Sequence, residues 1–265
     1  MKWTSEAEEA VKKVPFFVRK KVRSRIENEA AKAGKKAVSL ADVKATQARF
    51  LSNMSSEIKG YQLDTCFGAS GCPNRANNGD KLLKRIERLL KEENLLGFLK
   101  QQVKGDLKFH HEFRITIADC PNACSQPQIK DIGIIGASLP VLTDETCTLC
   151  EACVDECREN AITLQKEKSR PDINYDLCLA CGKCLEACPT GTIADKKGFK
   201  VQLGGKLGRH PQLAKELPEI YSEDEVLNIV KKCIIFYKSN SKQGKRFAEV
   251  FTPADYKNFV RHYSP

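Results

Sequence analysis

Residues 109–124, "FHHEFRITIADCPNAC", place two cysteines directly behind a segment of alternating polarity. Large side chains recur at every second position from Phe109 to Ile117, with mostly polar residues between them. An alternation with a period of two predicts a half-buried β-strand. The strand leads directly to Cys120, and Cys124 follows in C-x3-C spacing. The stretch therefore predicts a strand that ends at a pair of candidate metal ligands.

Two further groups of cysteines lie downstream. Residues 147–157, "CTLCEACVDEC", follow C-x2-C-x2-C-x3-C, and residues 178–189, "CLACGKCLEACP", repeat that spacing and end in a proline. Closely spaced cysteine thiolates of this kind can hold iron–sulfur clusters. Two zinc sites are the alternative, since zinc also binds cysteine pairs with this separation. The doubling of the four-ligand pattern favours two iron–sulfur clusters.

This segment, residues 144–196, resembles the bacterial two-cluster ferredoxin domain. The resemblance implies two 4Fe–4S clusters with exchanged fourth ligands. One cluster is then held by Cys147, Cys150, Cys153 and Cys188, and the other by Cys157, Cys178, Cys181 and Cys184.

The compartment follows from the cysteines and from the start of the chain. Twelve of the 13 cysteines fall in tight groups, and Cys233 stands alone on the expected inner face of a helix. The opening "MKWTSEAEEAVKKVPFF" has no apolar core of an export signal. No apolar run approaches the roughly 18 residues of a membrane span. We therefore expect a cytoplasmic protein with reduced thiolates that bind metal.

Four grouped cysteines remain outside the ferredoxin-like segment. Cys66 and Cys72 are spaced C-x5-C in "CFGASGC", and Cys120 and Cys124 complete a set of four. The set is sufficient for a third cluster without borrowed ligands. Glycine and other small residues between ligands let backbone amides approach cluster sulfurs. A structural zinc or iron site and disulfides remain alternatives.

C-x5-C followed by C-x3-C resembles the cluster signature of siroheme-dependent sulfite and nitrite reductases. Candidate strands "IGIIG" at 132–136 and "FKVQLGG" at 199–205 agree with one half-repeat of that family, in branches that carry an inserted ferredoxin domain. The resemblance implies an α+β half-domain made of residues 60–143 and 197–265. It also implies a third 4Fe–4S cluster in which Cys124, as a catalytic residue, bridges to siroheme.

The family pairs two half-repeats, and this chain resembles one of them. The resemblance thus implies a homodimer or a hetero-oligomer. Candidate contacts to the siroheme carboxylates or the substrate anion are Arg75, which follows Cys72, and Lys206, Arg209 and His210 in a glycine-rich loop. Solvated surface charges are the alternative for each of these side chains.

The first 54 residues predict a separate helical domain. Three short helices are expected, followed by a linker at 53–60. "VPFFVR" and "IENEAAKAG" resemble the C-terminal helical domain of one subunit of light-independent protochlorophyllide reductase. Residues 1–60 hold 14 Lys and Arg against 7 Asp and Glu, whereas residues 144–197 hold 7 against 11. Because acidic residues flank the basic run "RKKVRSR", we do not expect nucleic-acid binding.

Taken with these resemblances, the sequence predicts an oxidoreductase or a subunit of one. A donor protein or partner redox subunit would reduce the ferredoxin clusters, and electrons would pass to the siroheme-coupled cluster to reduce sulfite or a similar oxyanion such as nitrite. The alternative is a non-catalytic electron-transfer subunit with several clusters and no siroheme.

Overall fold

The computed structural model describes residues 1–165, 167 and 169–263, with side chains except at positions 17 and 50–56. The chain divides into two compact units. Unit 1 comprises Met1–Ile58 and Asp106–Lys108, and unit 2 comprises Lys59–Gly105 and Phe109–Pro265.

Unit 1 holds three helices, as predicted. They are α1 (Ser5–Lys12), α2 (Phe16–Lys32) and α3 (Leu40–Ser56), and short strands β1 (Lys2–Trp3) and β2 (Ala37–Val38) pair in parallel. Thr4 caps α1 by accepting a hydrogen bond from the Ala7 amide. The predicted linker at 53–60 is wrong in its first half, because α3 continues through Ser56.

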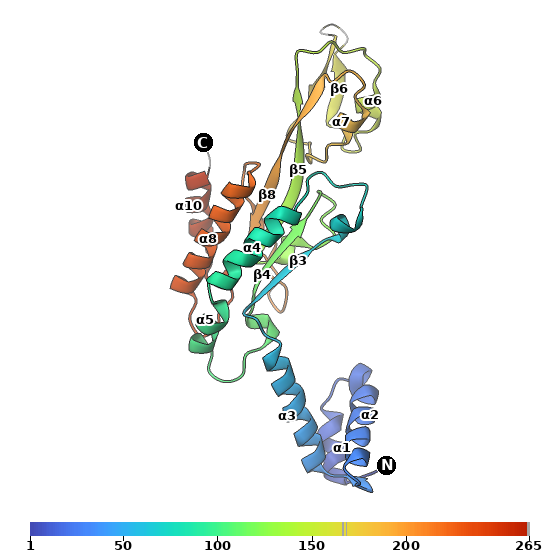
Figure 1. Ribbon diagram of the computed structural model, residues 1–265, viewed down its shortest axis with the longest axis vertical. Helices are drawn as coiled ribbons and strands as arrows, with labels where there is room; N and C mark the ends of the chain where they lie inside the picture. Colours follow the sequence, from blue (N-terminus) through green and yellow to red (C-terminus); the bar gives the residue numbers. More distant parts are fainter. Residues whose placement is uncertain (166, 168, 264–265) are drawn as a thin grey trace. The chain divides into compact units, whose positions relative to one another are not determined.

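A five-stranded mixed sheet forms the body of unit 2 (Figure 1). Its order is β3-β4-β5-β8-β9, with β3, β4 and β5 parallel and both β8 and β9 antiparallel to their neighbours. The chain is thus α+β, as predicted. The strand bounds are β3 Tyr61–Thr65, β4 Phe113–Ala118, β5 Ile132–Leu142, β8 Ile193–Leu203 and β9 Lys215–Glu216.

Helices α4, α8 and α10 lie side by side next to this sheet (Figure 1). Leu82, Ile86 and Leu90 line the buried face of α4. Ser222 and Glu225 form a capping box at the start of α8. The helices of unit 2 in the sheet region are α4 Asp80–Glu92, α5 Leu95–Gln102, α8 Glu223–Asn240, α9 Phe247–Val250 and α10 Pro253–Tyr263.

The ferredoxin-like segment lies between β5 and β8. These two strands pair from Ile132–Leu203 to Leu142–Ile193, far beyond the end of their neighbours. They carry a small subdomain with a second, two-stranded sheet, whose core includes Cys153 and Cys184. Its elements are α6 Ala152–Asp155, β6 Ile162–Gln165, β7 Arg170–Ile173 and α7 Lys183–Ala187.

The predicted strand at 109–117 is wrong in its first half. Phe109–His111 form the 3-10 turn η2, in which the rings of His110 and His111 contact each other 4.2 Å apart. The two histidines therefore belong to a turn that precedes the strand. The reason is the neighbouring strand: β3 begins at Tyr61, which pairs with Phe113, and it offers no partner further back.

Strand β4 is also buried on both faces and not on one. The polar Thr116 is 0% exposed, and its hydroxyl donates to the carbonyl oxygen of Asp64. Strands β5 and β8 exist as predicted but differ in length, because they pair with each other up to the ferredoxin-like segment. Gly204 and Gly205 lie beyond the end of β8.

Candidate functional site

The four cysteines outside the ferredoxin-like segment gather at one edge of the sheet. Cys66 follows β3 and Cys120 follows soon after β4, and parallel strands present their carboxyl ends at the same edge. The Cys66 amide donates to the carbonyl oxygen of Ile117, 3.0 Å away, which joins the two loops. Burial raises the pKa of the Cys120 thiol, and the nearby Cys66, Cys124 and Cys72 act in the same direction. The structure thus brings all four sulfurs together.

The surroundings of these sulfurs suit an iron–sulfur cluster. The amides of Gly68 and Asp119 donate to Cys66 Sγ over 3.4 and 3.3 Å, and Asn122 Nδ2 donates to Cys124 Sγ over 3.0 Å. Such N–H groups stabilise sulfur that carries negative charge. Cys124 is the exposed member of the set, whereas the other three are partly buried. Cys124 is therefore the sulfur best placed to reach a second group.

The eight cysteines of the ferredoxin-like segment form two groups in space. Cys147, Cys150, Cys153 and Cys188 line one small cavity. Burial raises the pKa of Cys184 to about 12, and the neighbouring Cys178, Cys181 and Cys157 add to that effect. The groups have the membership that the resemblance implies, with Cys157 and Cys188 exchanged. Their role as cluster ligands stays a prediction.

The spacing of these sulfurs differs from that around a single ion. Within the described part of the chain, no three His, Cys, Asp or Glu side chains are arranged to hold one metal ion. A 4Fe–4S cube binds each thiolate to a different iron, so its ligands lie further apart than those of a single zinc.

One of the two ferredoxin-like groups lies next to Cys66, Cys72, Cys120 and Cys124, which we call the third set of cysteines. This group consists of Cys157, Cys178, Cys181 and Cys184. The Ser138 amide in β5 donates to the carbonyl oxygen of Ala180, 2.8 Å away, and Ser138 pairs with Cys181. Lys183 Nζ lies 3.4 Å from the carbonyl oxygen of Pro73, the residue after Cys72. Arg75, Ser138 and Cys181 line one cavity of about 380 Å³. The group with Cys181 is thus the one that faces the third set.

The predicted anion contacts fall at two separate places. Arg75 lies beside the cysteines, where its guanidinium pairs with Asp119 and Asp80. Lys206 follows β8, whose last residue pairs with Ile132 at the opposite end of β5, and its Nζ lies 3.9 Å from a Glu249 carboxylate oxygen. Arg209 and His210 are exposed in the same loop. The structure does not bring Arg75 and this loop together.

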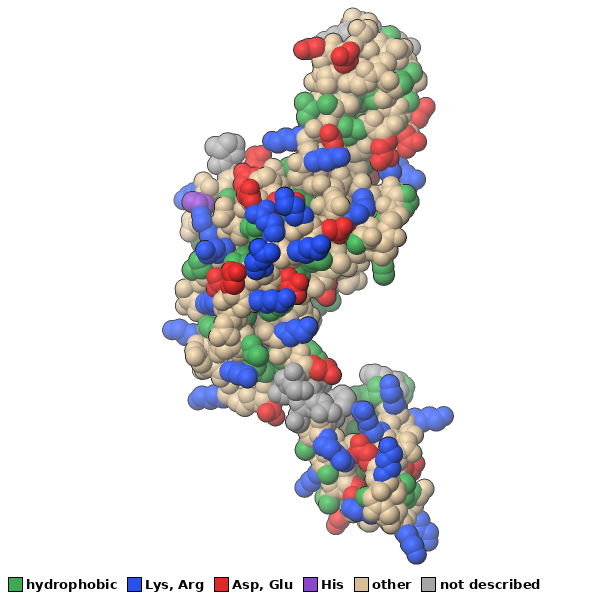
Figure 2. Space-filling model, in the orientation of Figure 1, with side chains coloured by type: hydrophobic (Ala, Val, Ile, Leu, Met, Phe, Trp, Pro, Cys, Tyr) green, Lys and Arg blue, Asp and Glu red, His purple; other side chains and the backbone are tan. Residues whose placement is uncertain are grey.

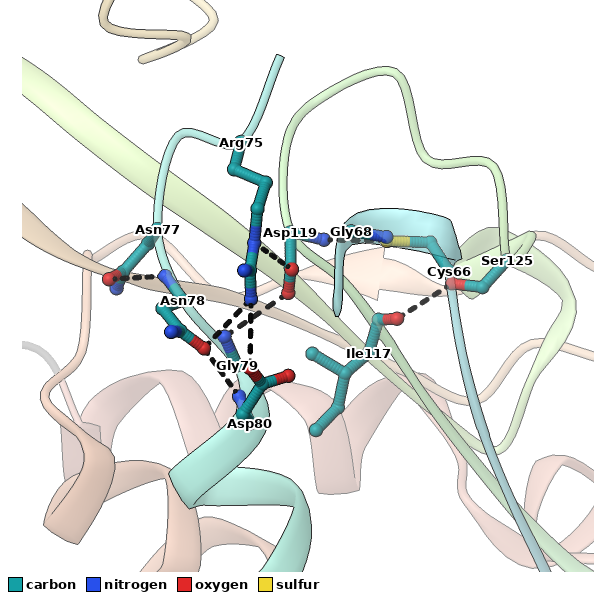
Figure 3. A network of polar contacts seen from close by, with 10 residues as sticks. All are labelled: Cys66, Gly68, Arg75, Asn77, Asn78, Gly79, Asp80, Ile117, Asp119 and Ser125. Carbon is teal, nitrogen blue, oxygen red and sulfur yellow. Dashed lines mark hydrogen bonds and ion pairs between the residues drawn. The ribbon is translucent and has the colours of Figure 1, made fainter. Parts of the chain in front are cut away.

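One residue of the site is absent from the sequence-based candidates. Asp119 immediately precedes Cys120, is 2% exposed, and contacts both the Cys66 loop and Arg75 (Figure 3). The available signal was an acidic residue directly between a strand and Cys120, because a buried carboxylate requires partners.

Comparison with protein families matches most of the chain to one family. Residues 61–264 match the family model described as the nitrite and sulphite reductase 4Fe-4S domain. Residues 3–47 match the model described as the proto-chlorophyllide reductase 57 kD subunit. The two matches follow the division of the chain into unit 1 and unit 2.

Curated relatives are similar over parts of their length. The chain is 35% identical to the coenzyme F420-dependent sulfite reductase of Methanocaldococcus jannaschii over 57% of this chain and 24% of that protein. It is 26% identical to one subunit of the anaerobic sulfite reductase of Salmonella typhimurium over 76% of this chain and 55% of that polypeptide. The chain therefore spans about a quarter to about half of these two relatives.

A solved structure has a similar fold. Dissimilatory sulfite reductase I matches with a TM-score of 0.50 and 14% identity, covering 75% of this chain and 51% of that one. Among the described residues, no helix is both long and apolar enough to span a membrane.

Proposed function

Because this chain belongs to the family of nitrite and sulphite reductase 4Fe-4S domains, we propose that it is a redox protein of sulfite reduction with three 4Fe–4S clusters. Sulfite, or a similar oxyanion such as nitrite, is the proposed substrate of the complete enzyme. The observation that carries the proposal is the meeting of Cys66, Cys72, Cys120 and Cys124 at the strand ends, with N–H donors aimed at sulfur.

Electrons are proposed to reach this set from the group that contains Cys181. Ala180 is hydrogen-bonded to Ser138, and Ser138 lies two residues from Gly136 along β5. A Cβ added to Gly136 would lie 2.5 Å from the carbonyl oxygen of Asp119, so the two backbones are in contact. A short path through bonds and one close contact thus connects Cys181 with Cys120, the residue after Asp119.

Siroheme is proposed as the partner of the exposed Cys124 sulfur, and it would supply the iron at which the oxyanion is reduced. The chain's own contribution is to present that sulfur at the surface, with the Asn122 amide donating to it. Since the chain spans part of its relatives, a second polypeptide or a second copy is proposed to complete the anion site.

A specific observation favours the alternative of an electron-transfer subunit without siroheme. Arg75 is paired with Asp119 and Asp80, and Lys206 lies near Glu249, so two of the predicted anion contacts have carboxylate partners within the chain. A cation held in this way has less capacity to bind an external anion.

Two measurements on protein purified without oxygen test the proposal. Iron and acid-labile sulfide should each come to about twelve per chain, because each cube holds four of each. After the protein has been supplied with siroheme, acid–acetone extraction should release a tetrapyrrole, which is recognised by its Soret band. About eight irons per chain would contradict the third cluster. Twelve irons without any tetrapyrrole would favour the electron-transfer subunit.

A further inference from the structure

Asp119 is hydrogen-bonded to the loops of Cys66 and Cys72, two members of the third set of cysteines. No sequence pattern predicts these contacts. Its main-chain amide donates to Cys66 Sγ, 3.3 Å away. Its carbonyl oxygen accepts from the amides of Ala76 and Asn77 over 2.9 and 3.1 Å. One backbone unit therefore contacts both the loop that starts at Cys66 and the loop that follows Cys72.

The Asp119 side chain is held on both of its oxygens (Figure 3). Oδ2 accepts from Arg75 Nε over 2.6 Å, and Oδ1 accepts from the Gly79 amide over 3.1 Å. Arg75 is held in turn, since its Nη2 donates to Asn78 Oδ1 and Asp80 Oδ2 over 2.8 and 3.3 Å.

The carboxylate also lies in a space that two glycines leave open. A Cβ added to Gly68 would lie 2.0 Å from Asp119 Oδ2, and one added to Gly79 would lie 2.8 Å from Oδ1. Gly68 is the same residue whose amide donates to Cys66 Sγ. The glycines of the Cys66 loop and of the α4 start thus make room for this carboxylate.

Electrostatics gives the pair a consequence for redox chemistry. A buried carboxylate beside a thiolate-bound cluster adds negative charge where an arriving electron must go, and it therefore disfavours reduction. Arg75 Nε lies 2.6 Å from that carboxylate and offsets its charge. Side-chain exposure is 3% for Asp119 and 24% for Arg75, so solvent screens the pair less than a surface pair.

We propose that Asp119 and Arg75 are a positioning pair that orders the Cys66 and Cys120 loops and sets the reduction potential of the cluster they hold. This inference rests on the proposed third cluster. It assigns Arg75 to charge balance at the cluster and not to the grip on siroheme or substrate.

The test compares two charge-removing variants of the full chain. Asp119→Asn keeps the shape of the side chain and removes the negative charge, so the potential of the third cluster should become more positive. Arg75→Gln leaves the carboxylate without its cation, so the potential should become more negative. Redox titration followed by electron paramagnetic resonance at mildly alkaline pH reads both shifts. The internal reference is the proposed cluster at Cys147, Cys150, Cys153 and Cys188, because these cysteines line a different cavity from Arg75.

Further variants separate charge from structure. Arg75→Lys keeps the cation and should retain a potential close to that of the wild type. Arg85→Gln and Glu223→Gln remove the charges of a pair between α4 and α8, 3.1 Å apart, and should move none of the potentials. Shifts of equal sign in Asp119→Asn and Arg75→Gln, or no shift in either, would overturn the inference. A wild-type chain without a third signal would instead refute the proposed function.

Discussion

Cys124 and Cys233 show how the surroundings of a cysteine decide what its sulfur can do. Cys124 is exposed and accepts a hydrogen bond from Asn122. Cys233 is 0% exposed within α8, and burial raises the pKa of its thiol. A thiol kept neutral among apolar side chains behaves as a small hydrophobic residue. The predicted core position of Cys233 is therefore confirmed.

Replacement of Cys120 by serine tests the third set directly. We expect Cys120→Ser to lower the iron content by about a third, since one of the three proposed cubes loses a ligand. The matched control is Cys233→Ala, which removes a cysteine outside the groups and should leave iron unchanged. Iron and sulfide assays on anaerobic protein give the readout. An undiminished iron content in Cys120→Ser would show that Cys120 holds no cluster.

Gly68→Ala tests the close approach between the Cys66 loop and Asp119. The added Cβ would lie 2.0 Å from Asp119 Oδ2, so the loop must move. We expect the free energy of unfolding to fall by about 1–3 kcal/mol, typical of overpacking, and the proposed third cluster to be lost before the other two. Thermal release of each cluster, followed by spectroscopy, measures this order. Ser70→Ala, an exposed position in the same turn, should behave as the wild type.

Asp131, directly before β5, has a buried carboxylate that faces β4 and the segment before α9. Asp131 accepts from the Arg114 amide over 2.8 Å, but its other oxygen lies 3.6 Å from Arg246 Nη2, too far for a hydrogen bond. Burial therefore dominates and raises the pKa of Asp131 from an ordinary value of 3.8 to about 6. The carboxyl group of Asp131 thus lies where three elements meet, and its negative charge is only partly offset by the neighbouring groups.

The raised pKa predicts how stability depends on pH. The folded chain binds the Asp131 proton more tightly than the unfolded chain does. This group therefore adds stability at low pH, and that contribution is lost as pH rises through about 6. The loss amounts to up to about 3 kcal/mol.

Urea denaturation between about pH 5 and about pH 7 measures this dependence. Asp131→Asn should flatten it. Asp64→Asn, at a half-exposed carboxylate paired with Lys130, should not change it. A slope that survives in Asp131→Asn would assign the pH dependence to another group.

In unit 2, basic and acidic side chains are concentrated in different places, the basic ones over a helix and the acidic ones in the ferredoxin-like segment. In the view of Figure 2, Lys and Arg side chains gather over α4, whose sequence is "DKLLKRIERLLKE". The ferredoxin-like segment carries the acidic excess, 11 Asp and Glu against 7 Lys and Arg in residues 144–197. Leu149, next to the exposed Cys150, is 38% exposed. We expect an electron donor with a basic docking face to approach this segment.

Electron delivery across unit 2 can be interrupted at Cys181. If the group with Cys181 feeds the third cluster, Cys181→Ser should slow reduction of that cluster by a protein donor at least about tenfold, a barrier increase of about 1.4 kcal/mol. Stopped-flow absorbance measures the rate. Thr148→Ala, an exposed position beside the other group, should leave the rate unchanged. Equal rates in the wild type and Cys181→Ser would place the electron path elsewhere.

Spacing along the chain was sufficient to predict the groups of cysteines and the three helices of unit 1, because each depends on residues a few positions apart. Strand limits and burial were not predictable in this way. The position where β4 begins depends on Tyr61, more than fifty residues earlier, and the burial of Thr116 depends on what covers the sheet. The Asp119–Arg75 pair likewise joins residues that are 44 positions apart in the sequence. Its contacts exist only once β3 and β4 are side by side, since a buried charge finds its partner through the packing of distant segments and not through local sequence.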